Sequence, residues 1–389
     1  MKLKRLNWTL LACALLLTAF GLYSLSILAS PANLASVSVT TAHLVKQVIF
    51  LGVSSVLAFI LLFPSYQVSR RFAYLSYGIC AAALVGLLIF GPYTRGARGW
   101  IPLGPISLQP AEFMKITFVL AVARWLSFAH EVESARSLAV PILFAALPTA
   151  LVFVQPDLGN AILFFPVLLA MLFVAGAPRR RLLALVLIAL VAIPITYAFG
   201  LKEYQRNRLI VYVHPDKNLS YQQEQSLRAV RSGAFSGRDV PEGARYPFHI
   251  PDRHTDFVYS VVAEELGFVG STAVLGLFAL FFLQAGRIAH RTADPYGRLV
   301  VMGLAVFWGL QVFINVGMNI GVAPITGLTL PFVSYGGSSL LTCFLSLATI
   351  LNVDMRWVPT FSSRDLDRGH VSIRGFEPQP FYWFRLGAR

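Results

Sequence analysis

The chain has 389 residues, of which 56% are hydrophobic and 13% are charged, and its mean hydropathy is +0.67. Soluble globular proteins carry about 25% charged residues, so this composition excludes that class and indicates a protein embedded in lipid. The formal net charge of +14 is explained by basic cytoplasmic loops and by attraction to anionic membrane lipid. We therefore expect membrane lipid as a partner and no nucleic acid.

About ten apolar runs follow one another along the chain. A helix of about 20 apolar residues crosses the hydrocarbon core of a bilayer, which is about 30 Å thick, and most of the runs approach this length. We predict an all-α polytopic membrane protein with about ten transmembrane helices, folded as a single domain over residues 1–389. The runs cover residues 8–28, 44–63, 72–91, 111–128, 137–154, 158–176, 181–200, 257–285, 298–318 and 337–353.

Basic residues in the short loops predict the orientation of these helices, because cytoplasmic loops are enriched in Lys and Arg. The chain begins with a basic segment, carries an arginine triplet at 179–181 and ends in a basic tail over 354–389, whereas 29–43 holds no Lys or Arg. We therefore expect both termini, and this tail, in the cytoplasm. The first run is longer than the apolar core of a cleaved signal peptide, and we interpret it as a signal-anchor.

A long polar stretch over residues 201–255 separates the seventh and eighth apolar runs. Connections of this length are commonly functional or disordered. The predicted orientation makes it a large extracytoplasmic loop. Its basic beginning, "YQRNRLIVYVHP", contains Arg206 and Arg208, and the amphipathic stretch "LSYQQEQSLRAVRSGAFSGR" that follows is expected to be helical.

The outer segment before the fourth run, "GPYTRGARGWIPLGPISLQPAEFMK", combines cations with the start of a helix. Pro110 suits the first turn of a helix, and Glu112 and Lys115 then lie three residues apart on one face. Two interpretations remain open. The two side chains neutralise each other at the helix entrance, or Lys115 and Arg98 form an outward-facing cationic pocket for an anion.

Two further polar segments interrupt the apolar pattern. "QPDLGN" places Gln155 and Asp157 at the outer ends of the fifth and sixth runs, where Asp157 as a helix cap is one sufficient explanation. "GVAPITGLTLPFVSYGGSSL", residues 321–340, is too rich in Gly and Pro for a helix. Non-helical backbone at membrane depth is buried in protein or lines a cavity. The 336–339 turn is therefore either a phosphate site at a helix start or part of a packed plug without a ligand.

The eighth run, "HTDFVYSVVAEELGFVG", retains three carboxylates, although a charge at the bilayer centre costs at least about 2.5–3.5 kcal/mol. Asp256 stands at its outer end, where it is either a helix cap, with Thr255 as a rival, or a general base. Glu264 follows eight residues later, about 12 Å deeper. We expect Glu264 or Glu265 to be buried and paired with a cation.

Four stretches together resemble one protein family. They are "GARGWIPLGPISLQPAEFMKI", "QPDLG", "RHTDFVYSVVAEELGFVG" and "PITGLTLPFVSYGGSS". In this order, and with the ten-run layout, they resemble the SEDS family (shape, elongation, division and sporulation) over nearly the whole chain. These polytopic bacterial proteins polymerise peptidoglycan glycan strands. The details of "QPDLG" and "VVAEELG" look more like the elongation branch of the family than the division branch.

The resemblance implies an inverting transfer of hexose from lipid II, a disaccharide-pentapeptide carried on undecaprenyl diphosphate. Asp256 would be the catalytic general base, and Arg98 and Lys115, helped by Arg206 or Arg208, would offset charge on the diphosphate. A divalent cation, Mg²⁺ or Mn²⁺, is an alternative for part of that task, although no metal-ligand spacing stands out. The substrate-binding residues expected on this basis are Arg98, Trp100, Glu112, Lys115, Gln155, Asp157, Arg206, Arg208, Ser334 and Ser338.

The resemblance also implies a location in the bacterial cytoplasmic (inner) membrane and a stable partner. The partner would be a class B penicillin-binding protein, a transpeptidase, together with other proteins of the elongation complex. Two other classes remain as alternatives. A lipid-linked-sugar transporter would need polar residues that continue to the inner leaflet, and a non-catalytic scaffold for the transpeptidase would tolerate the exchange of Asp256.

Overall fold

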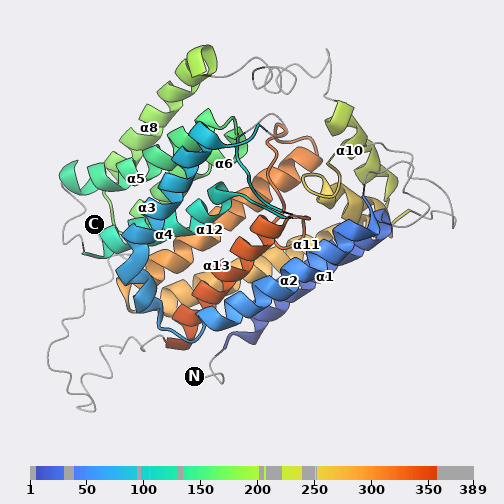
Figure 1. The fold of residues 1–389 in the computed structure, drawn as a ribbon, viewed down its shortest axis with the longest axis horizontal. Coiled ribbons are helices and arrows are strands. Elements are labelled where there is room, and N and C mark those ends of the chain that lie inside the picture. The colour runs from blue at the N-terminus through green and yellow to red at the C-terminus, as the bar shows by residue number, and fades with distance from the viewer. Residues whose placement is uncertain are drawn as a thin grey trace, which may run out of the picture.

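The protein is a bundle of long helices (Figure 1), seen here in a computed structural model. The structure describes residues 6–29, 39–93, 98–104, 106–128, 135–200, 206, 221–238, 250 and 252–356. Its elements are α1 (Trp8–Leu28), α2 (Thr41–Leu61), α3 (Tyr66–Phe90), β1 (Ile101–Leu103), β2 (Ile106–Leu108), α4 (Pro110–Phe128), α5 (Ala135–Val154), α6 (Leu158–Ala161), α7 (Phe164–Val174), α8 (Arg179–Ile195), a π-helical turn (Thr196–Gly200), α10 (Tyr221–Ser232), α11 (Val258–Arg291), α12 (Pro295–Asn319) and α13 (Gly337–Arg356).

Six helices among the described residues are long and apolar enough to cross a membrane, namely α1, α2, α3, α11, α12 and α13. The chain is therefore a multi-pass membrane protein. The other predicted runs correspond to α4, α5, the α6–α7 pair and α8, and the total of about ten crossings stays a prediction. The sixth run is divided because Pro166 stands in the first turn of α7, where its ring would clash with the carbonyl of a continuous preceding helix.

Helices α12 and α13 form the centre of the bundle, and the apolar side chains of α13 are nearly all buried. α12 packs against α4, α7, α11 and α13, and α2 packs along α13 with most of its own surface exposed. Figure 1 shows α8 at one edge of the bundle, while α10 lies at the end where α11 begins. The exposed apolar faces of α2, α3 and α8 suit contact with lipid.

A small hairpin corrects the all-α prediction. β1 and β2 pair antiparallel, with Ile101 opposite Leu108, and Gly104 at the turn has a φ of +69°. The sequence prediction missed these strands because each has only three residues. The hairpin leads directly into α4, and it holds the start of α13 because the Ser338 hydroxyl donates to the Ser107 carbonyl at 3.3 Å.

Helix α11 is interrupted at Gly267, whose φ of +62° and ψ of −155° are not helical. The turn over 233–238 fills the interruption with backbone hydrogen bonds. The Phe268 and Val269 amides donate to the Ala234 and Phe235 carbonyls at 3.0 and 3.1 Å. α10 and the turn after it are thereby attached to the first third of α11.

We expect Gly267→Ala to lower the free energy of unfolding, because a Cβ atom there would lie 2.3 Å from the Gly237 nitrogen and alanine rarely adopts this φ. Backbone strain of this kind costs about 1–3 kcal/mol. Gly276→Ala on the same helix is the control, since its Cβ would meet nothing within 4 Å. This substitution should raise the free energy of unfolding by about 0.5–1 kcal/mol. Thermal unfolding in detergent compares the two variants, and equal shifts would contradict the prediction.

Two predictions concern the long polar segments of the chain, the loop over 201–255 and the tail over 354–389. The helix expected in the outer loop is confirmed as α10, although residues 201–205, 207–220, 239–249 and 251 lie outside the described residues. The cytoplasmic tail expected over 354–389 stays a prediction, and its first three residues form the end of α13, where Asp354 pairs with Arg291. Residues 357–389 lie outside the described part.

Candidate active site

A cavity of about 2090 Å³ opens between the hairpin, α2, α5, α7, α8 and the segments that precede α11 and α13. The lining from α5, α7 and α8, called here the apolar side, consists mostly of apolar side chains. The lining from the other segments, called here the polar side, brings together the motifs that the sequence singled out. The polar residues on this side include His43, Lys46, Gln109, Glu112, Asp157, Asn160, Asp252, His254, Thr255, Asp256, Thr329, Ser338 and Ser339.

Asp256 lines this cavity from the turn that precedes α11. Its carboxylate faces the broken segment before α13, since a Cβ on Gly327 would lie 3.6 Å from its Oδ2 atom. The capping interpretation is wrong, because α11 begins at Val258 with Phe257 in the capping position and no side-chain capping bond from it. The rival Thr255 instead donates its hydroxyl to the Asp252 carbonyl at 3.0 Å.

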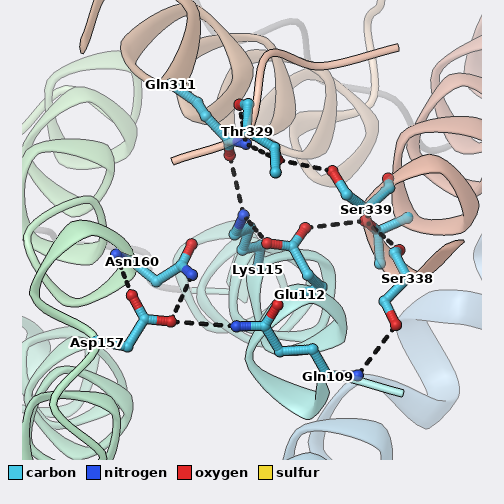
Figure 2. Close-up of polar contacts among 10 residues, drawn as sticks. Gln109, Glu112, Lys115, Asp157, Asn160, Gln311, Thr329, Ser338 and Ser339 are labelled. Carbon is cyan, nitrogen blue, oxygen red and sulfur yellow. Dashed lines mark hydrogen bonds and ion pairs between the residues drawn. The ribbon is translucent and has the colours of Figure 1, made fainter. Parts of the chain in front are cut away.

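The Glu112–Lys115 pair is buried beside the cavity (Figure 2). The Lys115 ammonium lies 2.5 Å from Glu112 Oε1 and 2.9 Å from Gln311 Oε1, and its side chain is 1% exposed. The second Glu112 oxygen accepts from the Thr342 hydroxyl at 3.3 Å, and Gln311 donates to the Thr329 carbonyl at 2.8 Å. This geometry matches the mutually neutralising pair, with Glu112 at the cavity wall. A direct contact between Lys115 and an anion stays a prediction.

Asp157 is both a helix cap and a residue of the cavity lining. It caps α6 by accepting from the Asn160 amide at 3.1 Å, and it lines the cavity. Its other oxygen accepts from the side chains of Asn160 at 2.7 Å and Gln109 at 3.2 Å (Figure 2). Burial raises the pKa of this carboxyl above its ordinary value, and the hydrogen bonds from Asn160 oppose the rise.

The remaining predicted residues take varied positions. Trp100 and Ser338 line the cavity, and the Ser338 hydroxyl also accepts from the Gln109 amide at 3.0 Å. Gln155 is 1% exposed and donates to the Leu84 carbonyl at 2.9 Å, which makes it a contact between helices. Ser334 is also buried, and its hydroxyl joins the Leu330 amide to the Thr255 carbonyl.

The predicted cations Arg98 and Arg206 are not among the residues that line this cavity. Arg98 is exposed and donates to the Leu88 carbonyl at 2.9 Å, next to the cavity residues Gly99 and Trp100. Arg206 donates to the Ala198 carbonyl at 2.5 Å. Arg208 lies outside the described residues. Their contacts with a substrate stay predictions.

Lys46 is a cavity residue that the sequence analysis missed. Among the described residues that line the cavity, it is the one Lys or Arg. Its signal was present in the sequence, because His43, Lys46 and Phe50 stand three and four residues apart on one face of an apolar helix, and all three line the cavity. A cation within a membrane helix is as costly as a carboxylate, and it indicates a functional site for the same reason.

The charges of the cavity wall are mostly negative, with four carboxylates, from Glu112, Asp157, Asp252 and Asp256, beside Lys46. The part of the chain that the structure describes contains no cluster of three or more His, Cys, Asp or Glu side chains suited to a metal ion. The start of α13 adds polar backbone to the same wall through Gly336, Gly337, Ser338 and Ser339. A cavity wall that holds several carboxylates and one cation suits deprotonation of a hydroxyl near an anionic group.

Comparison with known proteins decides the family. Residues 7–357 match the family described as "Cell cycle protein", whose members include FtsW, RodA and SpoVE. The chain belongs to the SEDS family. Its curated relatives include the peptidoglycan glycosyltransferase MrdB of Escherichia coli strain K12, which is 34% identical over 71% of this chain and 76% of that protein. The probable peptidoglycan glycosyltransferase FtsW of Thiomicrospira cyclica is 36% identical over 79% of this chain and 81% of that protein.

Solved structures agree with this membership. The rod shape determining protein RodA of Thermus thermophilus has a TM-score of 0.67 to this SEDS protein at 31% identity, covering 90% of this chain and 96% of that one. A chain from a peptidoglycan synthase complex that coordinates polymerization and crosslinking has a TM-score of 0.78 at 32% identity, covering 90% and 97%. The fold of this SEDS protein is therefore that of solved relatives over nearly its whole described length.

Proposed function

We propose that this protein is a peptidoglycan glycosyltransferase that polymerises lipid II, with Asp256 as its general base. The observation that carries the proposal is the position of Asp256, whose carboxylate lines a large cavity and is not required to cap α11. Relatives that are 34–36% identical over more than two thirds of the chain are named peptidoglycan glycosyltransferases.

The reaction requires one proton transfer and one displacement. Asp256 takes the proton from a sugar hydroxyl of the acceptor as that oxygen attacks the anomeric carbon of the donor. The bond from this carbon to the diphosphate breaks, and undecaprenyl diphosphate leaves with the electron pair. An α-linked donor gives a β-linked product in this way, so a single carboxylate suffices and no covalent intermediate on the protein is needed.

The leaving diphosphate needs positive charge nearby. Lys46 is placed to supply it from α2, since it lines the same cavity as Asp256. Arg98 would contribute from the cavity edge. Lys115 would act at a distance by holding Glu112, which it contacts at 2.5 Å. Fixed charges of this kind lower the barrier because they are already oriented when charge develops.

The apolar side of the cavity suits the polyprenyl chain of such a substrate. Small side chains on α5 and α8 leave an apolar surface that a hydrocarbon chain can occupy after leaving the bilayer. The lining residues there include Ala145, Ala146, Ala150, Ala189 and Ala192. This division into polar and apolar sides supports a lipid-linked substrate over a soluble one.

Polymerisation of labelled lipid II by the purified protein tests the proposal. We expect glycan strands from the wild-type protein, and the yield should rise when a class B penicillin-binding protein is added. A transporter would move lipid II across a liposome membrane without making polymer. A scaffold would give the same yield with Asp256→Ala as with the wild type. Either result would refute the proposed activity.

We expect Lys46→Met to lower kcat/KM for lipid II by about 10²–10³, because removal of one oriented charge at a transition state commonly costs this much. Arg98→Ala, at the cavity edge, should have a smaller effect in the same direction. Arg228→Ala is the control, since Arg228 is an exposed cation on α10 that pairs with Glu224. Initial rates over a range of lipid II concentrations give the comparison. An unchanged rate for Lys46→Met would assign the diphosphate to other groups.

The cellular role and the partner are the finer parts of the proposal. We place the protein in the cytoplasmic membrane of a bacterium, with both termini inside, in the complex that elongates the cell. A class B penicillin-binding protein is the expected partner, and the similar chain from a peptidoglycan synthase complex supports this. Because relatives named FtsW and MrdB match about equally well, the preference for elongation over division comes from the motifs alone.

A further inference from the structure

Two buried asparagines of α12 hold the backbone of Asp256. The Asp256 carbonyl accepts from the side-chain amide of Asn315 at 2.9 Å and from that of Asn319 at 3.2 Å. Both asparagines are 0% exposed, and they lie one helical turn apart on the same face. Two donors from one rigid helix therefore converge on the carbonyl of the proposed base.

Asn315 also connects Asp256 to the segment that its carboxylate faces. The same amide group donates to the Leu328 carbonyl at 2.6 Å. Leu328 follows Gly327, where a Cβ atom would lie 3.6 Å from the Asp256 Oδ2 atom. One side chain thus sets the spacing between the turn that carries Asp256 and the opposite wall of the cavity.

Asn319 supplies the cap that α11 lacks. Its Oδ1 atom accepts from the Ser260 amide at 3.1 Å, and Ser260 is the third residue of α11. This amide is one that the side chain of a capping residue ordinarily satisfies. Because the cap comes from α12, an aspartate just before the helix can turn its carboxylate toward the cavity.

We propose that Asn315 and Asn319 are positioning residues for the Asp256 carboxylate. They act through its backbone, Asn315 by fixing the turn against the cavity wall and Asn319 by capping α11 in its place. The inference rests on the proposed function of Asp256 as the base. It assigns a reason for two polar side chains in the apolar interior, where each must be fully hydrogen-bonded.

The test compares Asn315→Leu and Asn319→Leu with wild type in lipid II polymerisation. We expect kcat to fall about 10- to 100-fold, since small displacements of a reacting group cost up to about that much, while KM changes less than about threefold. Asn315→Ser and Asn319→Ser are milder variants that retain a hydroxyl too short to reach the Asp256 carbonyl. They should show the same split between kcat and KM with better folding.

Asn352→Leu is the matched control on α13. Asn352 is also buried, donates to the Leu61 and Pro64 carbonyls at 2.7 and 2.8 Å, and accepts from the Tyr66 amide in the first turn of α3. Its removal should lower the melting temperature as much as removal of Asn315 and leave kcat of the folded fraction unchanged. Equal loss of kcat in the control would reduce Asn315 and Asn319 to structural residues.

Hydrogen exchange gives a readout that does not depend on activity. Amides of residues 252–260 should exchange faster in the Asn315 and Asn319 variants than in wild type, and should be unaffected in Asn352→Leu. Unchanged exchange, or faster exchange with unchanged kcat, would overturn the inference. If wild-type protein made no glycan at all, the proposed function itself would be refuted. If wild-type protein were active and the asparagine substitutions changed neither kcat nor hydrogen exchange, only the role of Asn315 and Asn319 would be refuted.

Discussion

Asp256→Ala is expected to abolish glycan synthesis in a protein that still folds and inserts into the membrane. Asp256→Asn should be nearly as inactive, because the amide preserves the shape of the side chain but cannot accept a proton. Loss of a positioned general base commonly lowers the rate by about 10²–10⁴. The measurement is the initial rate of polymerisation of labelled lipid II by purified variants.

The control for this prediction is a carboxylate that does not line the cavity. Glu224 on α10 is exposed and pairs with Arg228, so Glu224→Gln should leave both rate and stability unchanged. Each variant needs a melting curve, since a fall in rate that follows a fall in folded fraction says nothing about proton transfer. A folded Asp256→Asn protein with most of the wild-type rate would contradict the assignment of the base.

Local features of this fold were predictable from the sequence. The helices follow the apolar runs because a buried or lipid-exposed backbone must satisfy its own hydrogen bonds. Pro110 does begin α4, and Glu112 and Lys115 do pair across three residues of that helix. Asp157 does cap α6. Each of these outcomes depends on residues fewer than six positions apart, so periodicity and spacing contain the information.

Contacts between distant segments were not predictable in the same way. Lys46 lines the cavity because α2 packs along α13, more than 280 residues later in the chain, where Gln47 accepts from the Gly336 amide at 3.2 Å. Asn315 contacts the Asp256 carbonyl across 59 residues. A single sequence contains no measure of such pairings. The burial of Glu264 was predicted from the energetics of the membrane, but its partners were not identified.

Glu264 of the apolar helix α11 is stabilised by two arginine partners. The side chain of Glu264 is 0% exposed and forms an ion pair with Arg253, which is 1% exposed, and it lies 3.4 Å from Arg238. Arg238 belongs to the turn after α10, and its amide also donates to the Glu264 carbonyl at 2.9 Å. The glutamate therefore joins α11, the turn before it and the turn after α10, at the end of the bundle where α11 begins.

Glu264→Leu should be among the most destabilising single substitutions in this protein. It would leave the Arg253 guanidinium buried without its carboxylate, and breaking a buried pair from one side costs about 3–5 kcal/mol. The double variant Arg253→Met with Glu264→Leu should recover most of that loss, because apolar side chains of similar size replace both charges. Chemical unfolding in detergent measures the free energies.

The exposed Glu224–Arg228 pair on α10 provides the comparison, since its side chains are 41% and 56% exposed. Glu224→Ala should cost less than about 1 kcal/mol. If Glu264→Leu cost no more than this, or if the double variant were no more stable than the single one, the charge pair would not be what holds the turn. Since Arg253 stands three residues before Asp256 in the same turn, Glu264→Leu should also slow glycan synthesis. If the double variant recovers both stability and rate, the rate depends on a well-ordered turn and not on the buried charges themselves.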